Sequence, residues 1–567
     1  MKILRLLLLT VCVALFLSGC NKPDKKFTLA ITNARIWTGN PAQPWAQALL
    51  VSGDTLYKIG STEELAGQID EALQVVDAGG RLVVPGFIDS HTHTIMGGHR
   101  LSSVQLKIVS TRNEFITAIA NYARTLKPGE WILGGDWDHQ HWGGELPTHE
   151  WIDSVTKNNP LWLERSEGHS GLANQLALSQ AGIVKSTPNI EGGMIVRDKS
   201  GTPTGILKDN AMVFIFKAIP DLSEAQKQLA IEGAMTYYLR EGVTSVHHMI
   251  EPHERNLGGV ATDYAAFKKM HDEGKLKVRF YIAEPFTDWE IVAARIKKEG
   301  TGDKWLKTGA LKGYVDGAIG SHSALFYEDY TDKPGFKGSQ VNKDEDLYNL
   351  VKSGDRAGLH ICIHAIGDLA INKALRVFEA VGKENGTIDP RFRIEHTQHL
   401  ASADISFMKK LDVIASMQPY HAIDDGIWCE QAIGPDRIKT TYAIGSLMKE
   451  GVHVAFGSDW FVAPPSPLKG MFAAVTRRTL DGKNPGGWVP DQKIGLEEAL
   501  RNYTWEGAYA SFDEKIKGTL EPGKLADMVI LEKNIFEIDP KDLFDAKVDA
   551  TIVGGTIVYD RGRQWNK

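Results

Sequence analysis

Two histidines separated by one residue, in the stretch VPGFIDSHTHT, are the first residues of this chain whose spacing suggests chemistry. His91 and His93 follow an apolar run, and on an extended chain alternate side chains point to the same side. Such a pair is either incidental to the end of a core strand or the beginning of a metal site. A metal needs further ligands, which must come from elsewhere in the chain.

Four more ionisable residues lie in or at the ends of later apolar runs. Taken alone, each has an ordinary structural explanation, such as a hydrogen-bonded core histidine, a salt-bridged lysine or a helix-capping aspartate. Their joint order favours a site for Zn²⁺ or another first-row divalent ion, because such ions bind nitrogen and oxygen donors. The four residues are Lys312 in LKGYVDG, His364 after HICI, His396 after RFRIE and Asp459 after HVAFGS.

The elements that must position these residues form a repeating pattern of short apolar strand, loop and helix. One clear helix, DLAINKALRVFEAVGKENG, lies between two such strands and ends near a glycine. Many such units predict an α/β fold with a (β/α)8 TIM-type barrel over residues 85–514, rather than an open sheet. In such barrels the chemistry lies at the carboxyl ends of the strands.

Two further units are predicted around the barrel. Alternating strands at both chain ends, residues 27–84 and 515–567, predict one small β-sandwich domain built from both termini. The segment of about 97–240 is too long for one β/α unit, so it predicts an inserted subdomain.

The first residues predict export of the protein. Residues 1–19 combine Lys2 and Arg5 with an apolar stretch of signal-peptide length, and they end before Cys20 in a sequence that resembles a bacterial lipobox. We expect lipidation of Cys20, a tether over residues 20–26 and a membrane anchor on the periplasmic side of the bacterial cell envelope. Asn21 favours the outer membrane. An ordinary secretory signal is the alternative.

The composition is that of a globular protein, with 567 residues and a formal net charge of −7. Acidic and basic residues are interspersed, which argues against a nucleic-acid partner and leaves a small-molecule substrate, with a homo-oligomer possible. Two cysteines remain beyond the first twenty residues, Cys362 and Cys429. Cys362 lies in an apolar run, so a buried free thiol is favoured over a disulfide.

The order of these motifs resembles the metal-dependent amidohydrolase superfamily, and within it the YtcJ-like branch that includes N-substituted formamide deformylases. The resemblance covers nearly the whole chain after residue 26. It is carried by VVPGFIDSHTH, LKGYVDGAIGSHSALF, IHAIGD, IEHTQ, MQPYHAIDD, GSDW, AVTRRTLDG and the closing KGTLEPGKLADMVILE.

The resemblance implies a metal centre with one or two ions, most simply Zn²⁺. His91 and His93 would bind the more buried ion, His364 and His396 the second, and Asp459 would contact the first. Lys312 would react with CO₂ to form a carbamate that bridges the two ions. The expected activity is hydrolysis of a non-peptide C–N bond in a small molecule, with Asp459 as the catalytic residue.

Candidate substrate contacts are His169, Asn174, His322, Tyr420 and His421. Trp137, Trp142, Trp428 and Trp460 either line a pocket or pack between elements, and the role of Asp209, where the branch often has glutamate, stays open. Two alternatives also remain. The same metal site could act on an ester, lactone or cyclic amide, or the protein could be a non-catalytic cell-surface binding lipoprotein.

Overall fold

A computed structural model describes residues 26–165, 170–190, 193–250, 260–562 and Trp565. The predicted signal peptide, Cys20 and its lipidation, most of the tether and His169 lie outside these residues. Within the described part of the chain, no helix is both long and apolar enough to cross a membrane.

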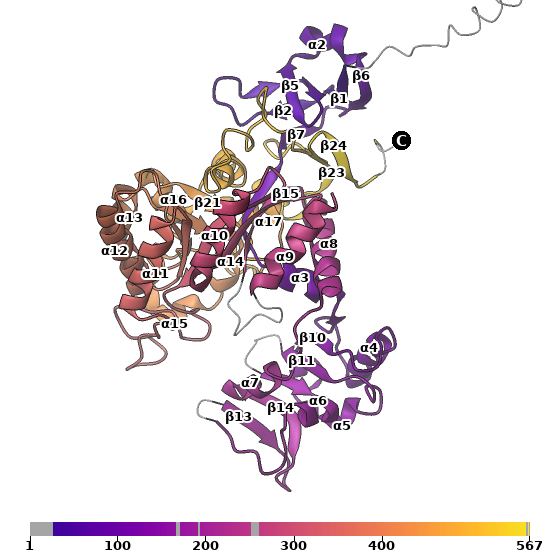
Figure 1. The fold of residues 1–567 in the computed structure, drawn as a ribbon, viewed down its shortest axis with the longest axis vertical. Coiled ribbons are helices and arrows are strands. Elements are labelled where there is room, and N and C mark those ends of the chain that lie inside the picture. Colours follow the sequence, from indigo (N-terminus) through magenta and orange to yellow (C-terminus); the bar gives the residue numbers. More distant parts are fainter. Residues whose placement is uncertain (1–25, 166–169, 191–192, 251–259, 563–564, 566–567) are drawn as a thin grey trace, which may run out of the picture.

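The centre of the molecule is a ring of eight parallel strands (Figure 1). The ring closes between its first strand and the residues that follow its last strand. There His93 N donates to Trp460 O, and Asp459 N donates to His91 O. The predicted TIM-type barrel is therefore confirmed. Its strands are β8 (Phe87–Thr92), β15 (Val243–Met249), β16 (Arg279–Pro285), β17 (Leu306–Tyr314), β18 (His360–Ala365), β19 (Arg393–His396), β20 (Ile414–Met417) and β21 (Val454–Phe456).

Helices surround this barrel and bury their apolar faces in one large core with the outer faces of the strands. The helix expected from DLAINKALRVFEAVGKENG is α12 (Asp368–Asn385), which ends at Gly386 in the left-handed conformation, with φ +65°. Glycine is favoured there because it has no Cβ to clash. The other main helices of this layer are α3 (Thr94–Ser102), α8 (Glu224–Arg240), α9 (Val260–Asp272), α10 (Trp289–Glu299), α11 (Asp344–Arg356), α13 (Ser402–Lys410), α16 (Ile444–Glu450), α17 (Pro467–Thr476), α18 (Leu496–Asn502) and α19 (Trp505–Tyr509).

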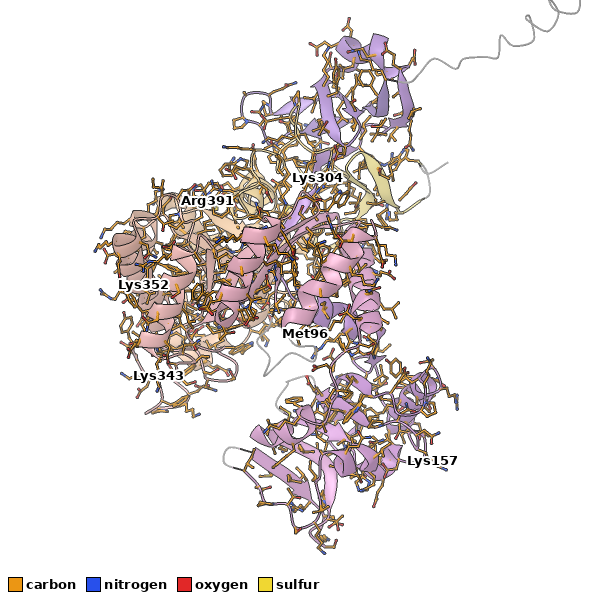
Figure 2. All side chains as sticks on the ribbon, in the orientation of Figure 1. Met96, Lys157, Lys304, Lys343, Lys352 and Arg391 are labelled. Atoms are coloured by element: carbon orange, nitrogen blue, oxygen red, sulfur yellow. The ribbon has the colours of Figure 1, made fainter. Side chains whose placement is uncertain are left out.

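The two ends of the barrel face different units. Lys304, just before β17, lies near the end that carries the terminal strands and forms an ion pair with Asp54 there (Figure 2). Met96, which follows β8, lies near the end that faces the inserted segment, as Figure 2 shows. The carboxyl ends of the strands, where chemistry is expected, therefore point toward the inserted segment.

Strands from both chain ends share one sheet, in the order β24-β23-β22-β7-β2-β3. A second sheet, β5-β4-β1-β6, comes from the N-terminal part alone, and buried apolar residues of both chain ends form a core separate from that of the barrel. The bounds are β1 (Phe27–Thr32), β2 (Arg35–Trp37), β3 (Trp45–Ala46), β4 (Ala48–Ser52), β5 (Thr55–Gly60), α2 (Thr62–Ile69), β6 (Ala72–Asp77), β7 (Leu82–Pro85), β22 (Met528–Leu531), β23 (Val548–Val553) and β24 (Thr556–Asp560).

The chain between α3 and α8 forms a third unit with its own six-stranded sheet and two cores. α8 itself packs on the barrel helix α3 so closely that a Cβ at Gly98 would lie 1.9 Å from Ala230 O. The unit contains β9 (Val104–Gln105), α4 (Arg112–Ala123), β10 (Ile132–Trp137), α5 (His149–Ile152), β11 (Leu161–Arg165), β12 (Ser170–Ala173), α6 (Gln175–Gln180), β13 (Gly193–Arg197), β14 (Pro203–Asp209) and α7 (Val213–Phe216).

A buried ion pair joins the barrel to the terminal strands. Arg279 at the start of β16 donates from Nε and Nη2 to the two carboxylate oxygens of Asp527, at 2.6 and 2.8 Å, and both residues are buried. Asp527→Asn would leave the guanidinium charge uncompensated, so we expect a loss of about 3–5 kcal/mol in the free energy of unfolding. Urea denaturation measures this, and a loss below about 1 kcal/mol would contradict it.

Candidate metal centre

Three of the predicted ligands converge at the carboxyl end of the barrel. His91 is the fifth residue of β8, His93 follows that strand, and Asp459 follows β21. Asp459 Oδ1 lies 3.0 Å from His93 Nε2 and 3.5 Å from His91 Nε2. One ligand atom from each residue falls within 4.8 Å of the others, and all three residues are buried.

Two features of this cluster suit a divalent cation: the kind of donor atoms it offers, and one buried oxygen that has no hydrogen-bond partner. Asp459 Oδ1 is buried and has no hydrogen-bond partner in acceptable geometry. A buried carboxylate facing two imidazole nitrogens is a donor set that binds Zn²⁺ and other first-row divalent ions.

The backbone at Asp459 is fixed in a strained conformation by its neighbours. Its φ of +57° lies in the left-handed region, which is uncommon for a residue with a side chain. Buried Asp89 holds the preceding residue, because its Oδ1 accepts from Ser458 N at 2.8 Å and its Oδ2 from Ser458 Oγ at 2.5 Å. The turn therefore aims the Asp459 carboxylate back at His91 and His93.

The other three predicted ligands lie beside this cluster. His396 ends β19, and its ring centre is 4.8 Å from that of His91 and 4.5 Å from that of His364, the fifth residue of β18. Lys312 in β17 places Nζ 3.4 Å from His91 Nε2 and is 2 % exposed. The structure thus brings all six sequence-predicted residues to one end of the barrel.

Each histidine has one ring nitrogen held by a protein oxygen. His91 Nδ1 lies 2.6 Å from Glu395 Oε2, and His93 Nδ1 lies 3.1 Å from Met249 O. His396 Nδ1 contacts Gln418 Oε1 at 3.0 Å, and His364 Nε2 contacts Gly317 O at 3.3 Å. Since a neutral imidazole has one N–H, these contacts leave the other nitrogen of each ring with a lone pair.

Burial keeps the imidazoles of His91, His364 and His396 neutral. Burial and the neighbouring Lys312 lower the pKa of His91 to about 4 and that of His364 to about 3. Burial, together with His364, holds the pKa of His396 well below its usual value. Neutral imidazoles are the form that binds a metal, because protonation would occupy the lone pair.

The predicted substrate contacts separate into two groups. Tyr420 and His421 lie on α14 (Pro419–Asp425), which begins directly after Gln418, the residue whose amide contacts His396. His322 lies in the loop after β17, and its Nε2 lies 3.0 Å from Asp332 Oδ1. Their role as substrate contacts stays a prediction.

Asn174 requires a correction. It is buried in the inserted unit, caps α6 by accepting from Ala177 N, and also accepts from Leu161 N. Its amide nitrogen donates to Thr156 Oγ1 and Asn159 O. With its acceptor and donors used inside the subdomain, Asn174 has a structural role there and is not available to a substrate.

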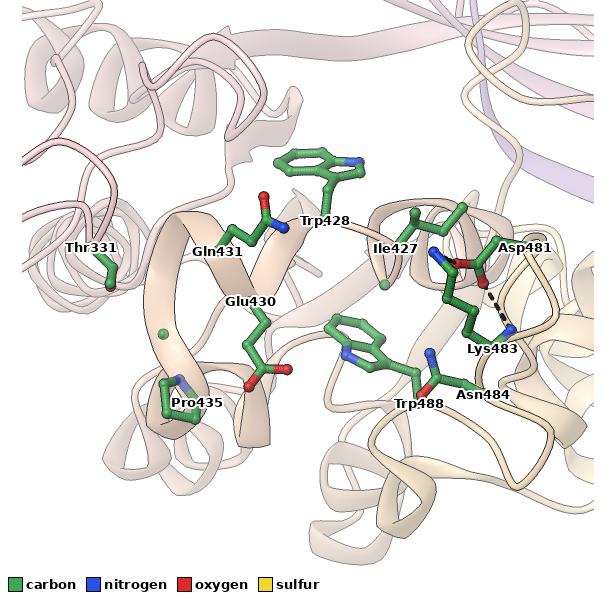
Figure 3. Close-up of a pocket in the computed structure, with 12 residues that line it drawn as sticks. Thr331, Ile427, Trp428, Glu430, Gln431, Pro435, Asp481, Lys483, Asn484 and Trp488 are labelled. Atoms are coloured by element: carbon green, nitrogen blue, oxygen red, sulfur yellow. Dashed lines mark hydrogen bonds and ion pairs between the residues drawn. The ribbon is translucent and has the colours of Figure 1, made fainter.

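Of the four candidate pocket tryptophans, three pack against other aromatic rings. Trp137 and Trp142 stack in the inserted unit, and Trp460 packs edge-on to Tyr237 and Tyr238. Trp428, before α15 (Cys429–Arg437), lines a pocket of about 480 Å³ together with Trp488, Glu430 and the Asp481–Lys483 ion pair (Figure 3).

Cys362 and Cys429 are both buried and unbridged. The predicted free thiol at Cys362 is confirmed, and the disulfide alternative is wrong.

Sequence reasoning missed two buried carboxylates that support the ligands. Glu395 contacts His91, and burial, which would raise its pKa, is outweighed by Arg393 and His91, so the pKa lies well below its usual value. Asp316 accepts from the backbone N–H groups of Leu325, Ile366 and Gly367 and so ties the loop after β17 to the end of β18. Both lie inside quoted motifs, Asp316 in LKGYVDGAIGSHSALF and Glu395 in IEHTQ, and strand alternation could have identified Glu395 as inward-facing.

Comparison with known proteins agrees with this geometry. The chain is 38% identical over 540 residues to Protein LONG AFTER FAR-RED 3 of Arabidopsis thaliana, covering 94% of this chain and 91% of the relative. It is 30% identical to putative amidohydrolase YtcJ of Bacillus subtilis (91% and 96% covered) and 28% identical to N-substituted formamide deformylase of Arthrobacter pascens (94% and 98% covered).

Among solved structures, an uncharacterized metal-dependent hydrolase of Pyrococcus horikoshii matches with a TM-score of 0.76 and 27% identity, covering 90% of this chain and 99% of that one. The sequence model of the amidohydrolase family matches residues 74–559, which include the barrel, the inserted unit and, of the strands near the chain ends, β7, β22, β23 and most of β6 and β24. The expected resemblance to this family and to its YtcJ-like members is confirmed. This chain belongs to the amidohydrolase family.

Proposed function

We propose that this metal-dependent hydrolase cleaves a non-peptide C–N bond of a small molecule, such as an N-acyl or N-formyl amine. The observation that carries the proposal is the buried triad of His91, His93 and Asp459, whose ligand atoms lie within 4.8 Å of one another. A carboxylate at that position can both contact a cation and exchange a proton, which hydrolysis of an amide requires.

Each residue of the proposed metal centre has its own role. His91, His93 and Asp459 would hold one divalent ion, proposed to be Zn²⁺, and His364 and His396 would hold a second beside it. A bound divalent ion supplies a Lewis acid that makes water more acidic and polarises a carbonyl oxygen. Asp459 accepts the proton of the attacking water and delivers it to the leaving nitrogen, so that amide and water become carboxylic acid and amine.

Lys312 is proposed to act as its carbamate. An ammonium group 3.4 Å from His91 Nε2 would repel a cation bound there, whereas reaction of the neutral amine with CO₂ gives an anionic oxygen ligand. The 2 % exposure of Lys312 shields such a carbamate from bulk water.

The choice of a C–N bond rests on the relatives. One of them, 28% identical over 561 residues, is named N-substituted formamide deformylase. An ester, a lactone or a cyclic amide remains the alternative substrate class, because the same two steps would serve each of them.

The test is a metal titration followed by substrate assays. Protein stripped with a chelator is reloaded with Zn²⁺ and bicarbonate, and N-formyl amines, N-acyl amines and matched esters are assayed at each metal ratio. We expect release of amine that rises with metal content up to two ions per chain. A faster rate on the esters would favour the alternative, and a fully loaded protein with no turnover on any of them would support a binding role.

A further inference from the structure

The interior of the barrel holds an ion pair directly beneath the metal centre. Arg393 and Glu395 are alternate residues of β19, so both point inward, and each is 0 % exposed. TIM-barrel interiors are usually filled with branched apolar side chains. Two buried charges here are therefore a departure that packing alone does not explain.

The contacts of Glu395 connect this pair to a metal ligand. Its Oε2 lies 2.6 Å from His91 Nδ1, and Arg393 Nη2 donates to the same oxygen at 3.1 Å. Arg393 Nε lies 2.6 Å from Oε1. Nη2 also contacts Ser90 O and Ser416 Oγ, Nη1 contacts His247 Nδ1, and these contacts fix the position of the guanidinium.

His91 is held differently from the other candidate ligands. His93, His396 and His364 make these hydrogen bonds to neutral oxygens, namely a backbone carbonyl, a side-chain amide and a backbone carbonyl. Asp316 Oδ1 lies beyond hydrogen-bond distance, 3.6 Å from His364 Nε2. His91 is held by a carboxylate, which makes a shorter and stronger hydrogen bond and increases the basicity of the opposite nitrogen. That nitrogen, Nε2, faces Lys312 Nζ and Asp459 Oδ1.

Energetics favour a functional reason for the pair. Removing two charges from water costs several kcal/mol per ion, and apolar side chains of similar volume often give equal or greater stability. This ion pair lies at the centre of the barrel, and one of its oxygens contacts a proposed metal ligand. Its effect on that ligand therefore explains why two charges are buried here.

We propose that Glu395 is a positioning residue: it fixes His91 with the proton on Nδ1 and strengthens Nε2 as a metal ligand, while Arg393 holds the carboxylate in place. This inference rests on the proposed metal site. According to this inference, the Arg393–Glu395 pair is the main determinant of metal affinity at the more buried ion site, the one that His91 would form.

The test measures metal affinity and metal spectroscopy, which are independent of turnover. Glu395→Gln keeps the size of the side chain and removes its charge, and we expect Zn²⁺ affinity at the first site to fall about 10–100-fold by chelator competition. The visible absorption of the Co²⁺-loaded variant should also change, because the orientation and basicity of one ligand change.

The matched control is Asp527→Asn, which breaks a buried arginine–carboxylate pair at the opposite end of the barrel. It should lose thermal stability and keep wild-type metal affinity. If the Glu395→Gln variant resembles this control, with lower stability but unchanged metal affinity and an unchanged Co²⁺ spectrum, the inference is overturned.

A second variant covers the case in which Glu395→Gln does not fold. Replacing both residues, Arg393→Met with Glu395→Met, removes the charges together and leaves no buried charge uncompensated. We expect this double variant to fold and to show the same loss of affinity, and wild-type affinity in it would equally overturn the inference. Failure of the wild-type protein to bind metal would instead refute the proposed function.

Discussion

Asp459→Asn is expected to lower kcat by about 10²–10⁴-fold in protein loaded with metal, the range that a general acid–base group contributes. Asparagine has nearly the same shape, so the turn fixed by Asp89 and Ser458 should survive. Its amide cannot accept the proton of the attacking water or return it to a leaving nitrogen. The substrate should still bind, so KM should change much less than kcat.

The measurement is steady-state kinetics expressed per metal-loaded site, with metal content determined for each preparation. This separates loss of the proton carrier from loss of the ion, because Asp459 is also a predicted ligand. Asp424→Asn is the matched control, since that aspartate is exposed on α14 and should keep wild-type turnover. Near-normal kcat in loaded Asp459→Asn protein would refute the role assigned to Asp459.

The parts of the site that the sequence could predict are those governed by strand geometry. Alternation placed His91 and His93 on one side of an extended segment, and the barrel pattern placed Lys312, His364 and His396 on neighbouring strands. Because parallel strands in a barrel present their carboxyl ends to one space, the order along the chain was enough to expect their convergence. The helix α12 followed from its apolar period and its terminal glycine.

The parts that could not be predicted depend on contacts between distant residues. Glu395 and Arg393 precede the predicted ligand His396 by one and three residues, yet their partners His91, Ser416 and His247 come from other strands. Alternation shows that they point inward but not what they meet.

For Asn174, the sequence predicted a functional contact where the structure shows a structural one. The sequence analysis placed Asn174 among the substrate contacts, but a polar side chain near a helix start is equally suited to capping that helix, which the structure shows it does. A single polar residue in the inserted unit therefore predicts less than a set of residues whose order along the chain follows the strands of a barrel.

Replacing Lys312 tests the bridge between the two proposed ions and should have a comparably large effect. Lys312→Met keeps a long apolar stem in the barrel but has no amine to react with CO₂. We expect it to bind at most one ion per chain and to lose at least about 10²-fold in kcat, because a second ion contributes several kcal/mol of transition-state stabilisation.

Dependence on CO₂ distinguishes a carbamate from an ordinary lysine. Stripped wild-type protein reloaded with Zn²⁺ should recover more activity with bicarbonate than in buffer freed of CO₂, and Lys312→Met should show no such difference. Lys307→Met is the control, because Lys307 lies on the same strand but binds Asp513 at the other end of the barrel, so it should still bind two ions. Recovery of two ions and full activity without CO₂ would refute the carbamate, since a protonated Lys312 beside His91 Nε2 would repel the cation that His91 is proposed to bind.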